Sequence, residues 1–206
     1  MTPSIDWARV VQAANFYQTV GYKQVDLPWT VDRKFSMATC PDPAFLVESS
    51  LGDLVGSAEQ SFIQQDYLGL LGKGKFQAIT PCFRRETTLD DLHQPSFLKL
   101  ELYVNEGDLF AAMREMARGA QTVAMEVVRE RAIATEIMLP APVLEEIDGG
   151  LDLTIGGIEL GSYGVRSFEH VAWAFGTGLA EPRLSSAIKL LENQANEKRK
   201  AYFSKM

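Results

Sequence analysis

The sequence predicts an α+β domain in which a mostly antiparallel β-sheet is flanked by helices. Consecutive strand-like segments are joined by tight turns or polar connectors, as antiparallel neighbours require. The helical segments do not alternate regularly with these strands, which disfavours a doubly wound parallel sheet. The chain has 206 residues, of which 46% are hydrophobic, and this size and composition fit one domain over residues 1–206.

The charge and composition exclude several classes of protein. There are 20 basic and 27 acidic residues, and the net charge of −7 argues against a protein that coats nucleic acid. Two cysteines, Cys40 and Cys82, are too few for a disulfide framework and suit a reducing compartment. No apolar run approaches the roughly 18 residues of a membrane span, and the first residues do not resemble a signal peptide. We therefore expect a soluble, unprocessed, cytoplasmic protein without a membrane partner.

The first part of the chain mixes helical and strand-like patterns. Apolar residues recur at helical spacing over residues 3–20, and residues 22–28 alternate like a strand that ends at a proline. Residues 30–43 are irregular, and we expect a mobile loop there. Residues 44–56 fit neither pattern, whereas residues 57–71 have the apolar spacing of a helix.

The middle of the chain predicts a hairpin with a long loop and then a long helix. Residues 75–84 and 97–104 are strand-like and are joined by the polar connector 87–95. Residues 108–136 have the clearest helical pattern, with an apolar stripe that is typical of packing on a core. The stripe consists of Leu109, Met113, Met116, Ala120, Val123 and Val127.

The last part predicts a second hairpin, a further strand and a closing helix. Residues 151–160 alternate around Gly156 and Gly157, which supply the positive φ angles of a two-residue turn. Residues 171–175 predict a strand, and the glycines within 176–178 allow the backbone to approach a ligand closely. The closing helix covers residues 184–202.

Three segments far apart in the sequence carry complementary chemistry. The first runs from Phe83 to Glu86 with His93 and Phe97, the second pairs Glu159 and Ser162 with Arg166, and the third runs from Gly176 to Arg183. Two arginines on different elements can grip a polyphosphate, because the guanidinium group matches phosphate geometry. A carboxylate and a hydroxyl can share Mg²⁺, which prefers hard oxygen ligands. An aromatic ring can stack on a flat base.

The same segments resemble, across nearly the whole chain, the catalytic core of the class II aminoacyl-tRNA synthetases. Residues 16–28 are similar to the family's first motif, which builds the homodimer interface. Residues 82–86, followed after a variable loop by 93–97, resemble the second motif, and residues 176–183 resemble the third. The pattern Glu-x-x-Ser at 159–162 lies between the second and third motifs, and the order of the motifs is that of the family.

The resemblance implies an ATP site built from residues of the second and third motifs. Arg84 is expected to hold the α-phosphate, and Glu86 the adenine amino group or an attacking amine. His93 is expected to meet the γ-phosphate, and Phe97 to stack on adenine. Arg183 is expected to cover the other face of adenine and touch the γ-phosphate, which makes Arg84 and Arg183 the expected catalytic pair.

The resemblance also implies a metal site and an amino-acid pocket. Glu159 and Ser162 are expected to carry Mg²⁺. The pocket is expected to be lined by four residues, namely Ser57, Glu59, Lys99 and Glu101. The sequence alone offers a second interpretation of two of them, because Ser57 suits a helix N-cap and Glu59 suits a first helical turn.

The implied function is ligase chemistry: ATP-dependent formation of an aminoacyl adenylate by a homodimer that associates through residues 3–28. The acyl group would then pass to tRNA, a carrier protein or a small acceptor. The motifs leave the amino acid open among seryl-, phenylalanyl- and pyrrolysyl-like enzymes, with 159–166 also similar to the aspartyl and lysyl group. The alternative is a non-catalytic paralogue that binds an amino acid or nucleotide as a regulatory or partner subunit. Two features favour it: no anticodon-reading module is recognisable, and Pro182 precedes Arg183 where the family usually has an acidic residue.

Overall fold

The computed structural model describes residues 4–40 and 42–204 and confirms the predicted α+β class. Within these residues a seven-stranded sheet pairs its neighbours antiparallel, except that β1 runs parallel to β5. Its strands lie in the order β1 (Lys23–Gln24), β5 (Lys75–Phe83), β6 (Ser96–Val104), β10 (Val171–Glu181), β9 (Ile158–Phe168), β8 (Gly150–Ile155) and β7 (Val143–Ile147). A small sheet has the order β2 (Thr30–Val31), β4 (Gly52–Leu54), β3 (Val47–Ser49). Pro3 and Pro41, which belong to predicted segments, lie outside the described residues.

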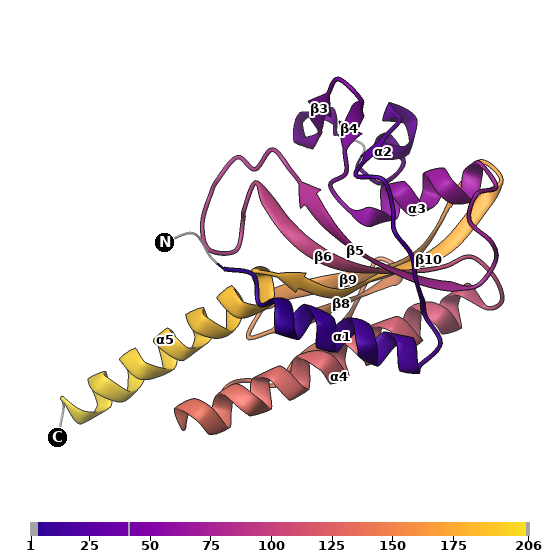
Figure 1. Cartoon of the computed structure of the whole chain (residues 1–206). Helices are drawn as coiled ribbons and strands as arrows, with labels where there is room; N and C mark the ends of the chain where they lie inside the picture. Colours follow the sequence, from indigo (N-terminus) through magenta and orange to yellow (C-terminus); the bar gives the residue numbers. More distant parts are fainter. Residues whose placement is uncertain (1–3, 41, 205–206) are drawn as a thin grey trace.

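Different helices cover the two faces of the large sheet (Figure 1). The helices α1 (Trp7–Thr19) and α4 (Leu109–Thr135) pack on one face, while α2 (Arg33–Thr39), α3 (Ala58–Tyr67) and the small sheet lie on the other. The last helix, α5 (Arg183–Phe203), starts at the end of β10 and extends away from the sheet (Figure 1). In the part of the chain that the structure describes, no helix combines the length and apolarity that crossing a membrane requires.

Several predicted elements are confirmed, and three segments differ from prediction. The helix predicted over 3–20 begins at Trp7, where the Asp6 side chain accepts a hydrogen bond from the backbone N–H of Arg9. The stretch 30–43, expected to be a loop, contains β2 and α2, because their few residues gain regular structure only by packing on α3 and β4. The unassigned stretch 44–56 contains β3, β4 and the last two residues of the short helix η1 (Pro43–Phe45), and β7 was not predicted at all.

The core is divided between the two faces of the large sheet by the period-two alternation of its strands. On β6, Leu98, Leu100 and Leu102 pack in the cluster under α1 and α4. The intervening residues face the other way, and Tyr103 stacks with Phe62 of α3, with ring centroids 4.8 Å apart. The same alternation therefore turns Phe97, Lys99 and Glu101 to the α3 face, where the predicted chemistry lies.

The glycines within 176–178 serve packing rather than the approach of a ligand, which corrects the sequence-based expectation. The strand β10 continues through them to Glu181 instead of ending at residue 175. A Cβ atom on Gly176 would lie 2.4 Å from the Tyr163 ring, and one on Gly178 would lie 2.9 Å from the Tyr17 ring. Both glycines thus make room for buried aromatic rings, whereas Thr177 between them lines the cavity described next.

Candidate functional site

A cavity of about 520 Å³ opens on the α3 face of the large sheet. Its walls come from α3, the strands β6, β9 and β10, the start of α5, and the connector after β5. Ten of the eleven predicted site residues line this one cavity: Ser57, Glu59, Arg84, Glu86, His93, Phe97, Lys99, Glu159, Ser162 and Arg183. The eleventh, Glu101, is fully buried and bonds to two of the lining residues, Ser57 and Lys99.

Arg84 and Phe97 meet at one end of the cavity because the β5–β6 hairpin pairs Phe83 with Ser96, which brings the next residues together. The Arg84 guanidinium carbon lies 5.1 Å from the centroid of the Phe97 ring, and its Nε donates to the carbonyl of Gly56 at 3.2 Å. The guanidinium group therefore lies over the Phe97 ring, and both side chains line the cavity, which suits a phosphate next to a flat base.

Arg183 is the first residue of α5 and joins two walls of the cavity. Its Nε donates to the carbonyl of Glu159 at 2.6 Å, and its Nη1 donates to the carbonyl of Leu92 at 3.1 Å. Among the described residues, neither Arg183 nor Arg84 has a carboxylate partner. Both guanidinium groups are thus oriented by neutral carbonyls instead of by ion pairs. Both residues also contact the connector 84–95, because Arg183 bonds to Leu92 and the backbone N–H of Arg84 bonds to the carbonyl of Pro95, and we call this part of the cavity its open end.

His93 is held at the cavity by a local turn of the connector. The Asp90 carboxylate accepts from the backbone N–H groups of Leu92 and His93, and its Oδ1 lies 2.9 Å from His93 Nδ1. Hydrogen bonding from His93 lowers the pKa of Asp90. Because Asp90 occupies Nδ1, the Nε2 atom is the ring nitrogen left to meet a ligand. Glu86 lines the same wall and is half-buried.

A bulge brings Glu159 and Ser162 together although they lie three residues apart on one strand. The β8–β9 pairing runs from Leu153 opposite Gly161 to Thr154 opposite Glu159, so Leu160 is an extra residue. The extra residue shifts the alternation of β9, and the Ser162 hydroxyl donates to the Glu159 carboxylate at 3.2 Å.

The Glu159 carboxylate and the Ser162 hydroxyl could supply part of the coordination of Mg²⁺. Mg²⁺ in nucleotide sites usually takes one or two carboxylates, with phosphates and water completing its octahedron. Among the described residues there is no group of three or more histidine, cysteine and acidic side chains that would form an all-protein metal cage. A metal bound at Glu159 and Ser162 would therefore depend on the phosphates of a nucleotide.

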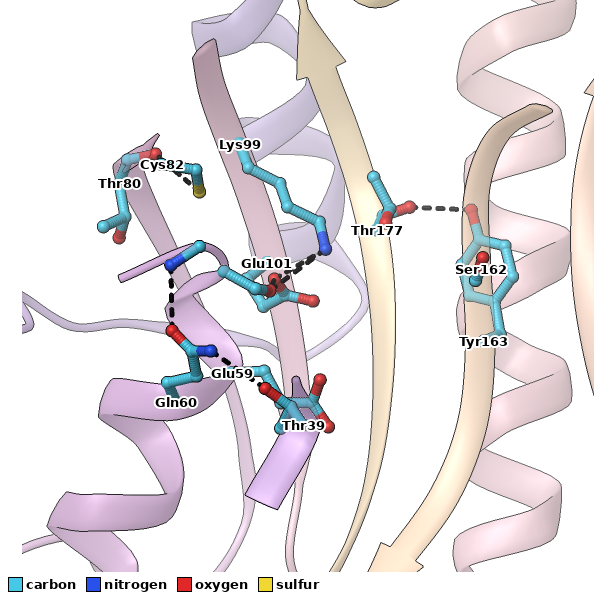
Figure 2. Close-up of polar contacts among 12 residues, drawn as sticks. Thr39, Glu59, Gln60, Thr80, Cys82, Lys99, Glu101, Ser162, Tyr163 and Thr177 are labelled. Atoms are coloured by element: carbon cyan, nitrogen blue, oxygen red, sulfur yellow. Dashed lines mark hydrogen bonds and ion pairs between the residues drawn. The ribbon is translucent and has the colours of Figure 1, made fainter. Parts of the chain in front are cut away.

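The floor of the cavity contains a buried network around Glu101 (Figure 2). The Lys99 ammonium lies 2.8 Å from Glu101 Oε2 and 3.2 Å from the Ser57 hydroxyl, which in turn donates to Glu101. Ser57 precedes α3 at the N-cap position but makes no capping bond, because its hydroxyl is bound to Glu101. The second oxygen of Glu101, Oε1, is buried without a hydrogen-bond partner among the described residues.

A second buried carboxylate, Glu59 of α3, is held by groups from two strands. Arg166 Nη1 on β9 lies 2.8 Å and 3.1 Å from its two oxygens, and Trp173 Nε1 on β10 donates to Oε1 at 2.8 Å. Burial raises the pKa of Glu59, and Arg166 opposes that rise. The carboxylate is only 3% exposed yet lines the cavity, so a ligand on the floor would meet an ordered acid.

Sequence reasoning missed several residues of the floor. Gln60 accepts from the backbone N–H of Gly56 at 2.8 Å and donates to Thr39 at 3.0 Å, so it ties α3 to α2 (Figure 2). Trp173 and Thr177 also face this side of the sheet. The alternation of β10 was the available signal, since residues 173, 175 and 177 share a face, but it did not indicate which face holds the site.

Comparison with solved structures places the fold among class II aminoacyl-tRNA synthetases. Two structures of pyrrolysyl-tRNA synthetase from Desulfitobacterium hafniense are similar, with TM-scores of 0.63 and 0.61 at 16% identity. The matches cover 88% and 86% of this chain and 68% and 67% of those chains. Seryl-tRNA synthetase from Pyrococcus horikoshii complexed with ATP matches with a TM-score of 0.61 and 16% identity, over 87% of this chain.

The chain therefore has the fold of the class II synthetase catalytic core, a large, mostly antiparallel sheet flanked by helices. The chain spans about half the length of the seryl enzyme, because the match covers 49% of that protein. No protein-family model matches the sequence, and no curated sequence resembles it significantly.

Proposed function

We propose that the protein uses ATP to activate the carboxylate of an amino acid, forming an aminoacyl adenylate and releasing pyrophosphate. The observation that carries this proposal is the division of charge in the cavity. Among the described residues, Arg84 and Arg183 have no carboxylate partner at the open end, whereas the floor pairs Glu59 with Arg166 and Glu101 with Lys99. The first end suits a polyphosphate and the floor suits a zwitterion. The synthetase-like fold adds support at the level of the class.

The chemistry asks mainly for positioning and charge stabilisation. An oxygen of the substrate carboxylate attacks the α-phosphorus in line, and pyrophosphate leaves. We assign the α-phosphate to Arg84, and the γ-phosphate to His93 and Arg183. Phe97 and Arg183 would hold adenine between them, with Glu86 at its amino group. Because a carboxylate is already a nucleophile, no general base is needed.

The remaining residues of the cavity have roles that follow from their positions. Magnesium held by Glu159 and Ser162 would, when bound, offset part of the phosphate charge. The residues Ser57, Glu59, Lys99 and Glu101 form the floor on which we place the amino acid. A floor that is polar but charge-balanced favours a substrate whose own charges cancel.

Amino-acid-dependent exchange of labelled pyrophosphate into ATP tests this proposal. The assay is run with each of the twenty standard amino acids and with pyrrolysine. We expect exchange with one or a few of them. Arg84→Ala should lower the rate by roughly 10²-fold to 10³-fold, as the loss of a donor to developing charge does. Arg85→Ala is the matched control, because Arg85 is an exposed neighbour that does not line the cavity.

Three outcomes would overturn the proposal or move the site. The absence of exchange with every amino acid, together with no ATP binding by calorimetry, would exclude activation. Binding of ATP without exchange would instead favour a non-catalytic binding protein. Equal rates for Arg84→Ala and the wild-type protein would show that the phosphate site lies elsewhere.

The acceptor and the assembly are further parts of the proposal. We propose transfer of the acyl group to tRNA, a carrier protein or a small amine. The test is to incubate the protein with ATP and the labelled amino acid, so that it forms the aminoacyl adenylate, and then to add each class of acceptor.

We also propose a homodimer through residues 3–28, where α1 exposes Trp7 (57%) and Val11 (51%). Exposed apolar residues on one helix suit an interface. A solution mass equal to one chain at all concentrations would exclude the dimer.

A further inference from the structure

We propose that Arg166 is a positioning residue that fixes the Glu59 carboxylate so that its one remaining acceptor site receives an N–H group of the substrate ammonium. This inference rests on the proposed activation of amino acids. It assigns a role to a residue that would not itself touch the reacting atoms.

The hydrogen bonds of Glu59 carry the first step. An ionised carboxylate has about four acceptor sites, two on each oxygen. Arg166 Nη1 approaches both oxygens and Trp173 Nε1 donates to Oε1, so Oε1 receives two donors and Oε2 one. One acceptor site on Oε2 is left, on a side chain that lines the cavity. A substrate ammonium is the kind of donor that fits a single remaining site on an anion.

The orientation of Arg166 carries the second step. Its guanidinium carbon lies 4.1 Å from the centroid of the Phe175 ring, so the group rests on an aromatic face as well as on Glu59. Arg166 comes from β9, Phe175 from β10 and Glu59 from α3. Three elements thus converge on one ion pair, which suits positioning of the carboxylate better than an incidental surface contact would.

The charges around Glu59 explain why Arg166 is needed. Glu101 and Lys99 of β6 face it and have opposite effects, the first raising and the second lowering the pKa of Glu59. Tyr103, also on β6, is neutral and bonds to Asp66. Arg166 is the strongest group that opposes the effect of burial. Without it, a larger share of Glu59 would be protonated and would no longer attract an ammonium.

The decisive experiment compares Arg166→Gln and Arg166→Lys with the wild-type protein in the exchange assay. Arg131→Gln is the matched control, because Arg131 forms a bidentate pair with Glu192, at 2.9 Å for both contacts, and lies outside the cavity. The KM values for the amino acid and for ATP are measured separately. The des-amino analogue of the activated amino acid is measured as an inhibitor, with thermal unfolding to check each fold.

We expect Arg166→Gln to raise the KM for the amino acid by roughly 10-fold to 10²-fold and to leave the KM for ATP within about twofold. Binding of the des-amino analogue should hardly change, because it has no ammonium to lose. Arg166→Lys should restore part of the loss, since one nitrogen lies near both oxygens in the wild-type protein. Equal rises of both KM values, or equal losses for the amino acid and its des-amino analogue, would overturn the inference.

A second measurement needs no activity and separates this inference from the proposed function. The indole N–H of Trp173 donates to Glu59, so its NMR resonance should report the protonation of that carboxyl. The indoles of Trp7 and Trp29, each 57% exposed, serve as internal controls. The Trp173 titration should move to higher pH in Arg166→Gln. An unchanged midpoint would overturn the inference even if exchange occurs. The absence of exchange in the wild-type protein would overturn the proposed function and the ammonium contact that rests on it, whereas a shifted midpoint would still show that Arg166 controls the Glu59 carboxyl.

Discussion

The two ends of the cavity, the open end with Arg84 and Arg183 and the floor with Glu59 and Glu101, differ in whether their charged side chains form ion pairs. At the end formed by Arg84 and Arg183, the guanidinium groups are oriented by backbone carbonyls and remain uncompensated among the described residues. On the floor, Glu59 and Glu101 are 3% and 0% exposed and each is paired with a cation. The open end can bind an anion without first breaking an ion pair, whereas the floor must keep its pairs to remain buried.

The difference shows that charged side chains can either remain available for a ligand or form buried ion pairs. A neutral carbonyl fixes an arginine in place at little electrostatic cost, so the arginine keeps its charge for a ligand. A buried carboxylate without its cation would be strongly destabilising, so the floor pairs contribute to folding as well as to binding. Substitutions at the two ends should therefore separate effects on activity from effects on stability.

The largest expected effect on stability is at Glu101. Glu101→Gln leaves Lys99, whose side chain is only 12% exposed, without its counter-ion, and should lower the free energy of unfolding by about 3–5 kcal/mol. Ser57→Ala keeps the ion pair and should cost only about 1 kcal/mol. Urea denaturation measures both. If Glu101→Gln were as stable as Arg84→Ala, which should stay within about 0.5 kcal/mol of wild type, the contrast between the two ends would fail.

The next effect is on activity and lies at the open end. Arg183→Ala should reduce pyrophosphate exchange by roughly 10²-fold, mainly through weaker handling of ATP, with unfolding little changed. Arg183→Lys keeps the charge but loses the fork that reaches both Glu159 and Leu92, so it should recover only part of the rate. If Arg183→Ala raised only the KM for the amino acid, Arg183 would act on the amino acid and not on ATP, which would contradict its assignment to the open end.

The smallest expected effect is a pH dependence at the floor. The pKa of Glu59 is raised by burial, so the folded state binds its proton more tightly than the unfolded state does. The contribution of this proton to the free energy of unfolding is complete when the pH is below the pKa of Glu59 in the unfolded state. It is lost as the pH rises through the pKa of Glu59 in the folded state. The stability of the wild-type protein relative to Glu59→Gln should therefore fall over that interval. Urea denaturation between about pH 4 and pH 8 measures it, and a difference that does not vary with pH would contradict the assignment.

Local patterns in the sequence determined most of the regular elements. The apolar stripe of α4 and the turn glycines Gly156 and Gly157, whose φ angles are +56° and +81°, predicted a helix and a hairpin that the structure contains. These signals are local, because a helix face or a turn is encoded within a few residues. The β2 and α2 segments carry no such signal, since two strand residues and seven helical residues gain their order from neighbours distant in the sequence.

The sequence by itself also determined which residue types are available for the site, and ten of the eleven predicted residues line one cavity. Only the tertiary structure decided how they are arranged. The extra residue Leu160 in β9 turns Glu159 and Ser162 to the same face, and no residue pattern predicted that bulge. The pairing of Glu59 with Arg166 and Trp173 joins positions 107 and 114 residues apart. Local spacing cannot predict such contacts, because the packing of α3 against β9 and β10 determines them.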